Sequence, residues 1–253
     1  MKKASYGIDA PTVVRNLALA GAVSLGLGIF ARSDVAADSA LSAVAPFFSW
    51  LVWPGVAWLL TAWWMLWGSL VFKKRTRDRL LDRVALTGRE RVLDVGCGRG
   101  LLLIAAAKRL RGKGGAAVGI DLWRTVDQSG NDAGVTRANA EAEGVLDTIA
   151  LETGDMTKMP FADASFDIVV SSWAIHNVPS ADGRKQALRE IARVLKPGGR
   201  VDILDIGPGR KYGGELVAAG LVEVVTRLDD AIFLIPTWSV RARKRAPAAD
   251  SLA

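Results

Sequence analysis

From residue 91 onward, short apolar runs alternate with stretches in which apolar residues recur every three to four positions. The first pattern is typical of buried strands and the second of helices that cover a sheet. Strands are predicted at Arg91–Val95, Ala117–Asp121, Thr148–Glu152, Ile168–Ser172, Arg200–Ile206, Val222–Arg227 and Ala231–Ile235. Helices are predicted at Leu101–Leu110, Asp132–Glu143 and Arg184–Leu195. This alternation predicts an α/β fold with a doubly wound, mostly parallel sheet.

The first 72 residues have a different pattern, with two long apolar runs. The second run, Phe47–Phe72, holds no charged residue and exceeds the roughly twenty residues that cross a bilayer core. Six tryptophans lie in it, and those near its ends suit a membrane-interface belt. The central ones face lipid in the simplest interpretation, or else a neighbouring helix or a lipid-like ligand. The tryptophans near the ends are Trp50, Trp53 and Trp67, and the central ones are Trp58, Trp63 and Trp64.

The first apolar run has two interpretations. As a second span of about residues 13–31 it would form a hairpin with residues 47–72, and Ala20, Ser24 and Gly28 would give a ridge for close helix approach. As a secretory signal it would end at the small residues Val35–Ala37. We favour the hairpin, because the polar leader before the run is long for a signal.

Basic residues follow the second run at once, in a juxtamembrane linker or helix at residues 73–90. By the positive-inside rule the domain that follows faces the cytoplasm, from a cell (inner) membrane. The net charge of the chain is +7. Basic residues also cluster at Arg241–Arg245, in a tail over residues 241–253 that is expected to be disordered. Beside a span, anionic lipid explains such clusters better than nucleic acid does.

Cys97 is the only cysteine, which excludes an intramolecular disulfide and a cysteine-based metal site. No metal site is expected, and we interpret Cys97 as a small structural residue inside a glycine loop. The sequence does not indicate an oligomeric state.

The richest chemical signal is the segment that follows the first predicted strand. Asp94 ends that strand, and glycines stand at 96, 98 and 100 before an apolar helix. A carboxylate beside the loop would repel a pyrophosphate but would suit an ammonium group. Asp121 ends the next strand, where it can accept hydrogen bonds from ribose hydroxyls. An ammonium and a ribose together describe S-adenosylmethionine better than a dinucleotide.

The segment Val92–Gly100 resembles motif I of the class I S-adenosylmethionine-dependent methyltransferases. Three further segments, 154–156, 160–173 and 195–200, resemble later motifs of the same family in the same order. The resemblance implies a Rossmann-like, seven-stranded sheet over residues 91–240, with an antiparallel final pair, preceded by one or two transmembrane helices. It also implies S-adenosylmethionine as methyl donor. The cofactor-binding residues that it implies are Asp94, Gly96, Gly98, Gly100, Asp121, Leu122, Trp123, Asp155, Met156 and Ser172.

Two features bear on the acceptor. His176, the only histidine, follows the fourth strand, in a segment that lines the methyl-transfer pocket in this family; it is a candidate base or a residue that positions the loop. The polar loop 121–131 is expected to be capped by Ser129 or Asn131. In it Trp123 could stack on the cofactor, and Asp127, Gln128 and Asn131 could reach substrate. An ordinary capped loop explains the same residues equally well.

Two functions follow from these features. The first is a membrane-anchored methyltransferase that acts on a small, membrane-associated, lipid-like or quinone-type acceptor. The alternative is a non-catalytic S-adenosylmethionine-binding membrane protein with a sensing or scaffolding role. The complete set of cofactor positions favours the first.

Overall fold

The computed structural model describes residues 4–40, 42–124, 130–230 and 235–247. The chain divides into two units. One unit comprises residues 8–72. The other comprises the first seven residues together with residues 73–253.

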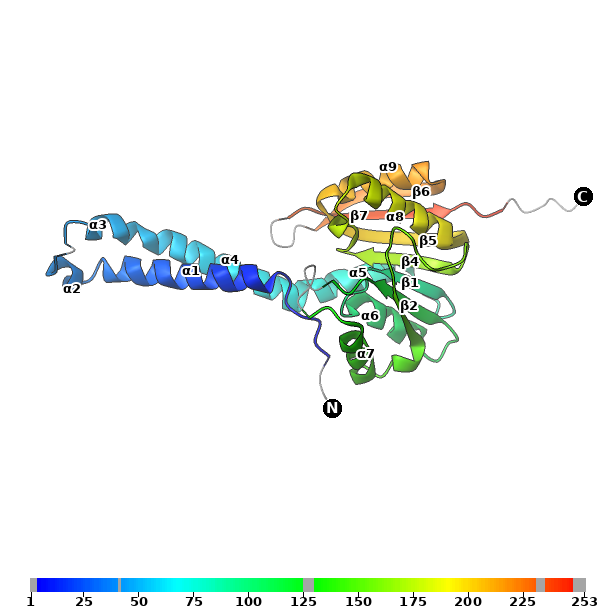
Figure 1. Ribbon diagram of the computed structural model, residues 1–253, viewed down its shortest axis with the longest axis horizontal. Helices are drawn as coiled ribbons and strands as arrows, with labels where there is room; N and C mark the ends of the chain where they lie inside the picture. The colour runs from blue at the N-terminus through cyan, green and yellow to red at the C-terminus, as the bar shows by residue number, and fades with distance from the viewer. Residues whose placement is uncertain (1–3, 41, 125–129, 231–234, 248–253) are drawn as a thin grey trace, which may run out of the picture. The chain divides into compact units, whose positions relative to one another are not determined.

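A seven-stranded sheet organises the larger unit, in the order β3-β2-β1-β4-β5-β7-β6 (Figure 1). The pairs among β1 to β5 are parallel, whereas β7 runs antiparallel to both β5 and β6. The expected Rossmann-like sheet with an antiparallel final pair is therefore present. The strands are β1 (Arg91–Val95), β2 (Ala116–Asp121), β3 (Ile149–Thr153), β4 (Phe166–Ser172), β5 (Leu195–Ile206), β6 (Leu221–Asp230) and β7 (Thr237–Lys244).

Apolar side chains on the two faces of the strands fill two separate cores. Leu93 and Val95 of β1 belong to one core, and Val92, on the opposite face, belongs to the other. Helices α8 (Ala181–Val194) and α9 (Tyr212–Ala218) cover the first face, while α5 (Lys73–Val84), α6 (Leu101–Leu110) and α7 (Ala133–Ala142) cover the second. The short helical turns of this unit are η3 (Leu146–Thr148), η4 (Ile175–Asn177) and η5 (Gly207–Lys211).

The C-terminal strand of this unit differs from the sequence-based expectation. The last strand is Thr237–Lys244, so residues 241–244 belong to the sheet rather than to a basic tail. The alternation of apolar and polar residues in this strand is hard to recognise, because arginines occupy one face. Val240 and Ala242, on the other face, are buried. The strand predicted at 231–235 lies almost wholly outside the described residues. The basic segment after Phe72 is a helix, α5, whose Leu80, Leu81 and Val84 are buried in the core.

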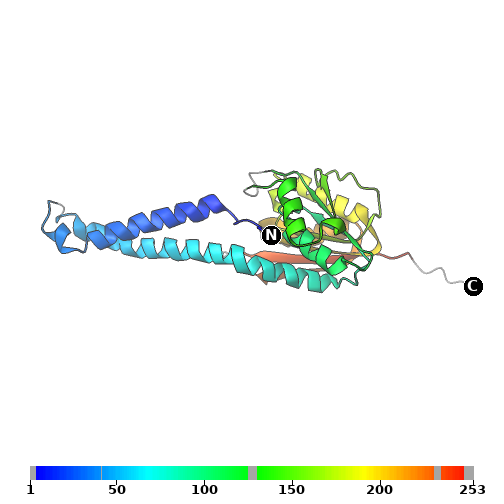
Figure 2. The same cartoon turned by 90° about the horizontal axis from the view of Figure 1, so that it is seen from below.

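The smaller unit is a helical hairpin (Figures 1 and 2). Its long helices, α1 (Pro11–Phe30) and α4 (Val52–Trp67), lie side by side. A π-helical turn, η2 (Gly68–Phe72), follows α4, and the connection between the long helices holds α2 (Asp34–Ala37), α3 (Ala45–Phe48) and η1 (Ser49–Leu51).

Small residues allow the two helices to approach closely. A Cβ at Gly28 would lie 2.5 Å from Val52 N, and one at Gly55 would lie 2.6 Å from Leu25 N. The Ser24 hydroxyl donates to Leu51 O at 2.9 Å. The contact ridge on α1 is Gly21–Ser24–Gly28, so the expected membership of Ala20, which is exposed, was wrong. At about 100° per residue, Gly21 lies about 20° from Gly28 around the helix, whereas Ala20 lies about 80° from it.

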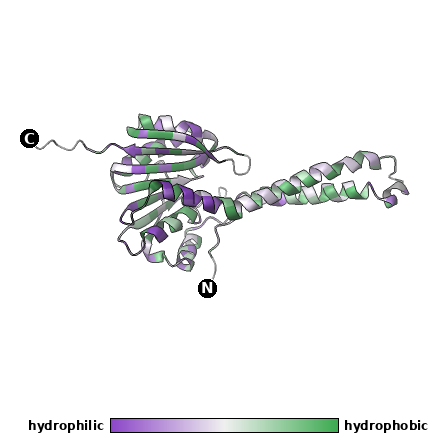
Figure 3. Cartoon of the chain, turned by 180° about the vertical axis from the view of Figure 1, so that it is seen from behind, coloured by the Kyte–Doolittle hydropathy of each residue, from purple (hydrophilic) through white to green (hydrophobic). Residues whose placement is uncertain are grey.

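Most large side chains of the hairpin point outward. All six tryptophans of α4 and its flanks are exposed, as are the apolar residues Leu19, Val23 and Ile29 of α1. Figure 3 shows the apolar colouring that runs along both helices. By length and composition, Pro11–Phe30 and the continuous helix Ala45–Val84 could each cross a membrane.

Candidate functional site

The glycine loop between β1 and α6 curls over the end of β2. Gly96, Gly98 and Gly100 have φ angles of 75°, 48° and 83°, a region that favours glycine. Gly96 N donates to Ile120 O at 2.8 Å, and Gly98 N donates to Asp121 Oδ2 at 2.8 Å. From α7, the Thr136 hydroxyl donates to Gly98 O at 2.7 Å. The loop is thus fixed from two sides before any ligand binds.

Asp121 lies at the centre of these contacts. Besides Gly98 N, it accepts from Trp123 N at 2.7 Å and from the Asn131 side chain at 3.1 Å. A carboxylate offers about four acceptor positions, so one remains. This leaves room for one ribose hydroxyl; accepting both, as expected from the sequence, would require Trp123 or Asn131 to move. The buried Asn131 Oδ1 has no hydrogen-bond partner among the described residues, and is a second acceptor beside the same carboxylate.

Asp94 is buried at the end of β1, with only 2% of its surface exposed. Its Oδ2 has no hydrogen-bond partner among the described residues. Burial raises its pKa to about 8, and the nearby Asp121 charge acts in the same direction. The raised pKa favours the neutral carboxyl, and an approaching cation would favour the ionised form. Burial also raises the pKa of the neighbouring Cys97 thiol, which suits a structural residue rather than a nucleophile.

The segments after β3 and β4 meet the glycine loop. A Cβ at Gly96 would lie 2.2 Å from Ala174 Cβ and 3.4 Å from Met156 Cε. The Ser171 hydroxyl donates to Val95 O at 2.8 Å, and its neighbour Ser172 is half-buried at the end of β4. The carboxyl ends of β1, β3 and β4 are thus brought together, as expected where α/β sheets bind ligands.

The turn after β3 is held by its own acid. Asp155 is exposed, and its Oδ1 accepts from Thr157 N at 2.7 Å, which fixes the turn that also carries Met156. The second oxygen of Asp155 can accept from a donor on a ligand.

The loop after β2 is described only at its ends, and residues 125–129 lie outside the described residues. Leu122 is exposed, and the indole N–H of Trp123 donates to Thr153 Oγ1 at 2.8 Å. The N-cap of α7 is Asp132, which accepts from Gly134 N at 2.7 Å, so a cap at Asn131 was wrong. Asn131 instead bonds Asp121. Asp127, Gln128 and Ser129, for which roles were predicted, lie outside the described residues.

His176 lies two residues after Ala174 and is held by a buried carboxylate. Its Nδ1 lies 2.6 Å from Asp205 Oδ1, and its backbone N–H donates to Asp205 Oδ2 at 2.9 Å. Asp205 is fully buried and also accepts from Ile206 N and from the Tyr212 hydroxyl. With Nδ1–H donated to Asp205, the second ring nitrogen, Nε2, is left as an acceptor.

Sequence reasoning missed Asp205 and Tyr212. The signal for Asp205 was present, because it is an acid at the carboxyl end of the apolar strand β5, as Asp94 and Asp121 are on their strands. Nothing in the sequence marks Tyr212, which reaches Asp205 only through the fold.

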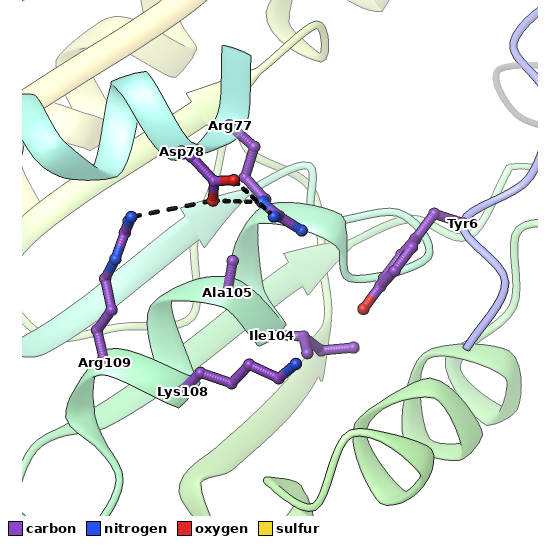
Figure 4. Close-up of a pocket in the computed structure, with 7 residues that line it drawn as sticks. All are labelled: Tyr6, Arg77, Asp78, Ile104, Ala105, Lys108 and Arg109. Atoms are coloured by element: carbon purple, nitrogen blue, oxygen red, sulfur yellow. Dashed lines mark hydrogen bonds and ion pairs between the residues drawn. The ribbon is translucent and has the colours of Figure 1, made fainter. Parts of the chain in front are cut away.

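A separate pocket lies on the outer side of α6 and is lined by Tyr6, Arg77, Asp78, Ile104, Ala105, Lys108 and Arg109 (Figure 4). Its cations are neutralised. Arg77 makes two 2.9 Å bonds to Asp78, Arg109 bonds Asp82 at 2.7 Å, and Lys108 pairs with Glu143. This balance of charge does not favour an anion site. Among the described residues, no cluster of three or more His, Cys, Asp or Glu side chains could hold a metal ion.

Most of the site residues described above lie within a stretch that matches a family model. Residues 93–203 match the model described as a methyltransferase domain. Methyltransferase GfsG of Streptomyces halstedii is 37% identical over 133 residues, covering 53% of this chain and 44% of the relative. A demethylmenaquinone methyltransferase of Lactobacillus johnsonii is 37% identical over 138 residues, covering 54% and 52%. The chain therefore spans about half the length of these curated relatives.

Solved structures show the same fold. The [4+2]-cyclase SpnF superposes with a TM-score of 0.57 at 19% identity, covering 69% of this chain and 82% of that one. A methyltransferase-like protein of Bacillus halodurans superposes with a TM-score of 0.52 at 21% identity, covering 68% and 100%. Over residues 93–203 the chain is therefore similar to methyltransferase domains.

Proposed function

We propose that this chain is a membrane-anchored methyltransferase that transfers a methyl group from S-adenosylmethionine to a small, membrane-associated acceptor of the quinone type. The observation that carries the catalytic part is the His176–Asp205 pair, two residues from the point where Ala174 contacts the glycine loop. A protein that only bound the cofactor would have no need for a base held in one tautomer there.

The residues of the crevice suit the cofactor. Two buried acceptors, Asp94 Oδ2 and Asn131 Oδ1, have no hydrogen-bond partner among the described residues and lie at the same edge of the sheet as the glycine loop. A ligand with an ammonium group and ribose hydroxyls brings the donors that these atoms lack. We assign Asp94 to the ammonium group, Asp121 to the ribose, and Asp155, Met156 and Trp123 to the adenine end, with Leu122 and Ser172 lining the site.

When bound, S-adenosylmethionine supplies an activated methyl group on a sulfonium sulfur. The protein has to align the acceptor and exclude water. We propose that His176 Nε2 takes the proton from an acceptor hydroxyl or from a carbon activated by one, and that Asp205 stabilises the imidazolium that forms. Tyr212 and the Ile206 N–H hold Asp205 in place.

The hairpin supports the membrane part of the proposal. Its tryptophans and the outward residues of α1 form an exposed apolar surface, which a water-soluble monomer rarely presents at this size. Among the relatives, the demethylmenaquinone methyltransferase name points to a quinone acceptor. We assign residues 8–72 to a cell (inner) membrane, with the methyltransferase domain in the cytoplasm beside its basic flank.

The test is methyl transfer in the presence of a lipid extract. Purified full-length protein in detergent is incubated with methyl-labelled S-adenosylmethionine and a membrane-lipid extract. We expect S-adenosylhomocysteine release together with label in the organic phase. Cofactor binding by calorimetry without any release of S-adenosylhomocysteine would instead support the non-catalytic alternative.

Carbonate extraction of membranes tests the anchor. We expect the full-length chain to stay in the membrane pellet. Release into the supernatant would show that the hairpin packs against a protein partner, and the membrane assignment would be wrong.

A further inference from the structure

The first residues of the chain are bound to the methyltransferase domain. Ser5, Tyr6 and Gly7, which we call the N-terminal strap, belong to the larger unit, although 65 residues of the hairpin unit follow them. Ser5 N donates to Asn139 Oδ1 at 2.9 Å, and Asn139 Nδ2 donates back to Ser5 O at 3.0 Å. Two residues of paired strands exchange backbone hydrogen bonds in the same way. Here the Asn139 side chain, from α7, takes the place of one of the two backbones.

Asn139 connects the strap to the glycine loop. It is 5% exposed, and its Nδ2 also donates to Arg99 O at 3.0 Å. Arg99 lies between Gly98, whose N–H bonds Asp121, and Gly100, which begins α6. One buried amide therefore holds both the strap and the centre of the cofactor loop.

A second contact joins the same two segments. Gly7 has a φ of 70°, and a Cβ there would lie 3.0 Å from Arg99 Nη1. A Cβ at Gly130, at the far end of the loop after β2, would lie 3.7 Å from the same atom. The Arg99 side chain thus lies between the strap and the loop that follows the ribose-binding strand.

Tyr6 and Lys73 fasten the strap. The Tyr6 ring packs against the core on the side of α6, lines the pocket of Figure 4, and its hydroxyl donates to Glu143 at 3.3 Å. Lys73, the first residue of the larger unit after the hairpin, donates to Tyr6 O at 3.0 Å and to Gly7 O at 2.6 Å. The points where the chain leaves and re-enters the domain are therefore fastened to each other.

We propose that the N-terminal strap is a positioning element of the cofactor site, acting through Asn139 on the glycine loop. The inference rests on the proposed function, because it concerns S-adenosylmethionine binding. A loop that is already ordered in the free protein loses less conformational entropy when the cofactor binds. The strap therefore raises cofactor affinity without contacting the cofactor. The glycine loop in turn stabilises the bound strap, since coupling between two sites is reciprocal.

The affinity test uses full-length protein in detergent and S-adenosylhomocysteine as the calorimetric probe. Tyr6→Ala removes the anchoring ring and is expected to weaken binding about tenfold. Tyr6→Phe keeps the ring and loses only the long bond to Glu143, so its affinity should stay within about twofold of the parent. If the strap acts through Asn139, then Tyr6→Ala combined with Asn139→Ala should bind no more weakly than Asn139→Ala alone.

Hydrogen exchange distinguishes coupling from a purely structural role of the strap, because a structural role alone would not make amide exchange in the strap depend on ligand binding. In the parent, S-adenosylhomocysteine should slow exchange of the Ser5 amide, which donates to Asn139. In Asn139→Ala this slowing should be lost. Equal affinity of Tyr6→Ala and the parent, or no change in exchange at Ser5, would overturn the inference. A parent that does not bind S-adenosylhomocysteine at all would overturn the proposed function instead.

Discussion

At the scale of single residues, the site depends on carboxyl groups whose protonation and partners the fold has set. Burial raises the pKa of Asp94 to about 8, from the ordinary 3.8. The folded state therefore holds a proton that the unfolded state has lost, and stability falls as pH rises through the window from about 4 to about 8. The group thus costs stability at neutral pH, and a bound cation recovers part of that cost.

Asp94→Asn should abolish this dependence, because the variant side chain stays neutral at every pH. Relative to the parent, the free energy of unfolding of the variant should therefore increase from pH 4.5 to pH 8, by about 1 kcal/mol or more, and its melting temperature should rise with it. Thermal unfolding followed at pH values from 4.5 to 9, without cofactor, measures the difference. A constant difference over this range would show that Asp94 is ionised in the folded state. Cofactor affinity should fall, because an amide cannot pair with an ammonium group.

Asp205→Asn should separate catalysis from binding. Loss of the carboxylate frees the His176 ring from one tautomer and one orientation, so the methyl-transfer rate should fall about a hundredfold or more. S-adenosylmethionine affinity should remain within about twofold, because none of the hydrogen bonds described for Asp205 reaches the glycine loop. Tyr212→Phe, which removes only the 3.2 Å bond to Asp205, is the matched control and should lose much less activity. Equal rates for Asp205→Asn and the parent would remove His176 from the mechanism.

At the scale of elements, close contact between α1 and α4 depends on glycine. Gly28 and Gly26 lie on the same helix, but only Gly28 faces α4, whereas a Cβ at Gly26 would meet nothing within 4 Å. Gly28→Val should therefore separate the helices and cost about 1–3 kcal/mol of hairpin stability. Gly26→Val should be close to neutral. Thermal unfolding of both variants in the same detergent provides the comparison, and equal melting temperatures would contradict the helix pair.

Much of the sheet was predictable because each strand is marked by local chemistry. The boundaries of β1 coincide with the predicted strand Arg91–Val95, and the glycines that follow predict the turn. The last strand was not predictable, since its inward residues Val240 and Ala242 are separated by arginines that look like a solvated tail. Its position is set by pairing with β5 and β6, which is non-local.

The residues of the candidate site also divide into those that the sequence reveals and those that only the fold reveals. Asp94, Asp121 and the three glycines carry their signal within a few residues, so a single sequence reveals them. Asn139 and Tyr212 carry none, because their roles depend on partners 134 and 7 residues away and on the direction in which a helix presents them. Asn139 reads as an ordinary polar helix residue, and only the fold brings it to Ser5.

At the scale of the whole molecule, the hairpin is an insertion into a domain that begins before it. Removing residues 8–72 and joining Gly7 to Lys73 through about four flexible residues should give a water-soluble domain, because Lys73 already lies within hydrogen-bond reach of Gly7. This protein should keep most of the parent's affinity for S-adenosylhomocysteine. A deletion of residues 1–72, which also removes the strap, should bind about tenfold more weakly. Calorimetry on the two truncated proteins makes the comparison, and equal affinities would show that the strap is dispensable.

The bond between Ser5 and Asn139 also sets an order of events during synthesis. Asn139 lies 134 positions after Ser5 and must leave the ribosome before this bond can form. The two long helices of the hairpin find their partners within residues 8–72, so they can pair long before Asn139 is made. In the proposed membrane hairpin, residues 5–7 therefore have to stay on the same side of the membrane as the rest of the domain. Translocation of these residues would leave the Asn139 side chain without its two hydrogen bonds to Ser5.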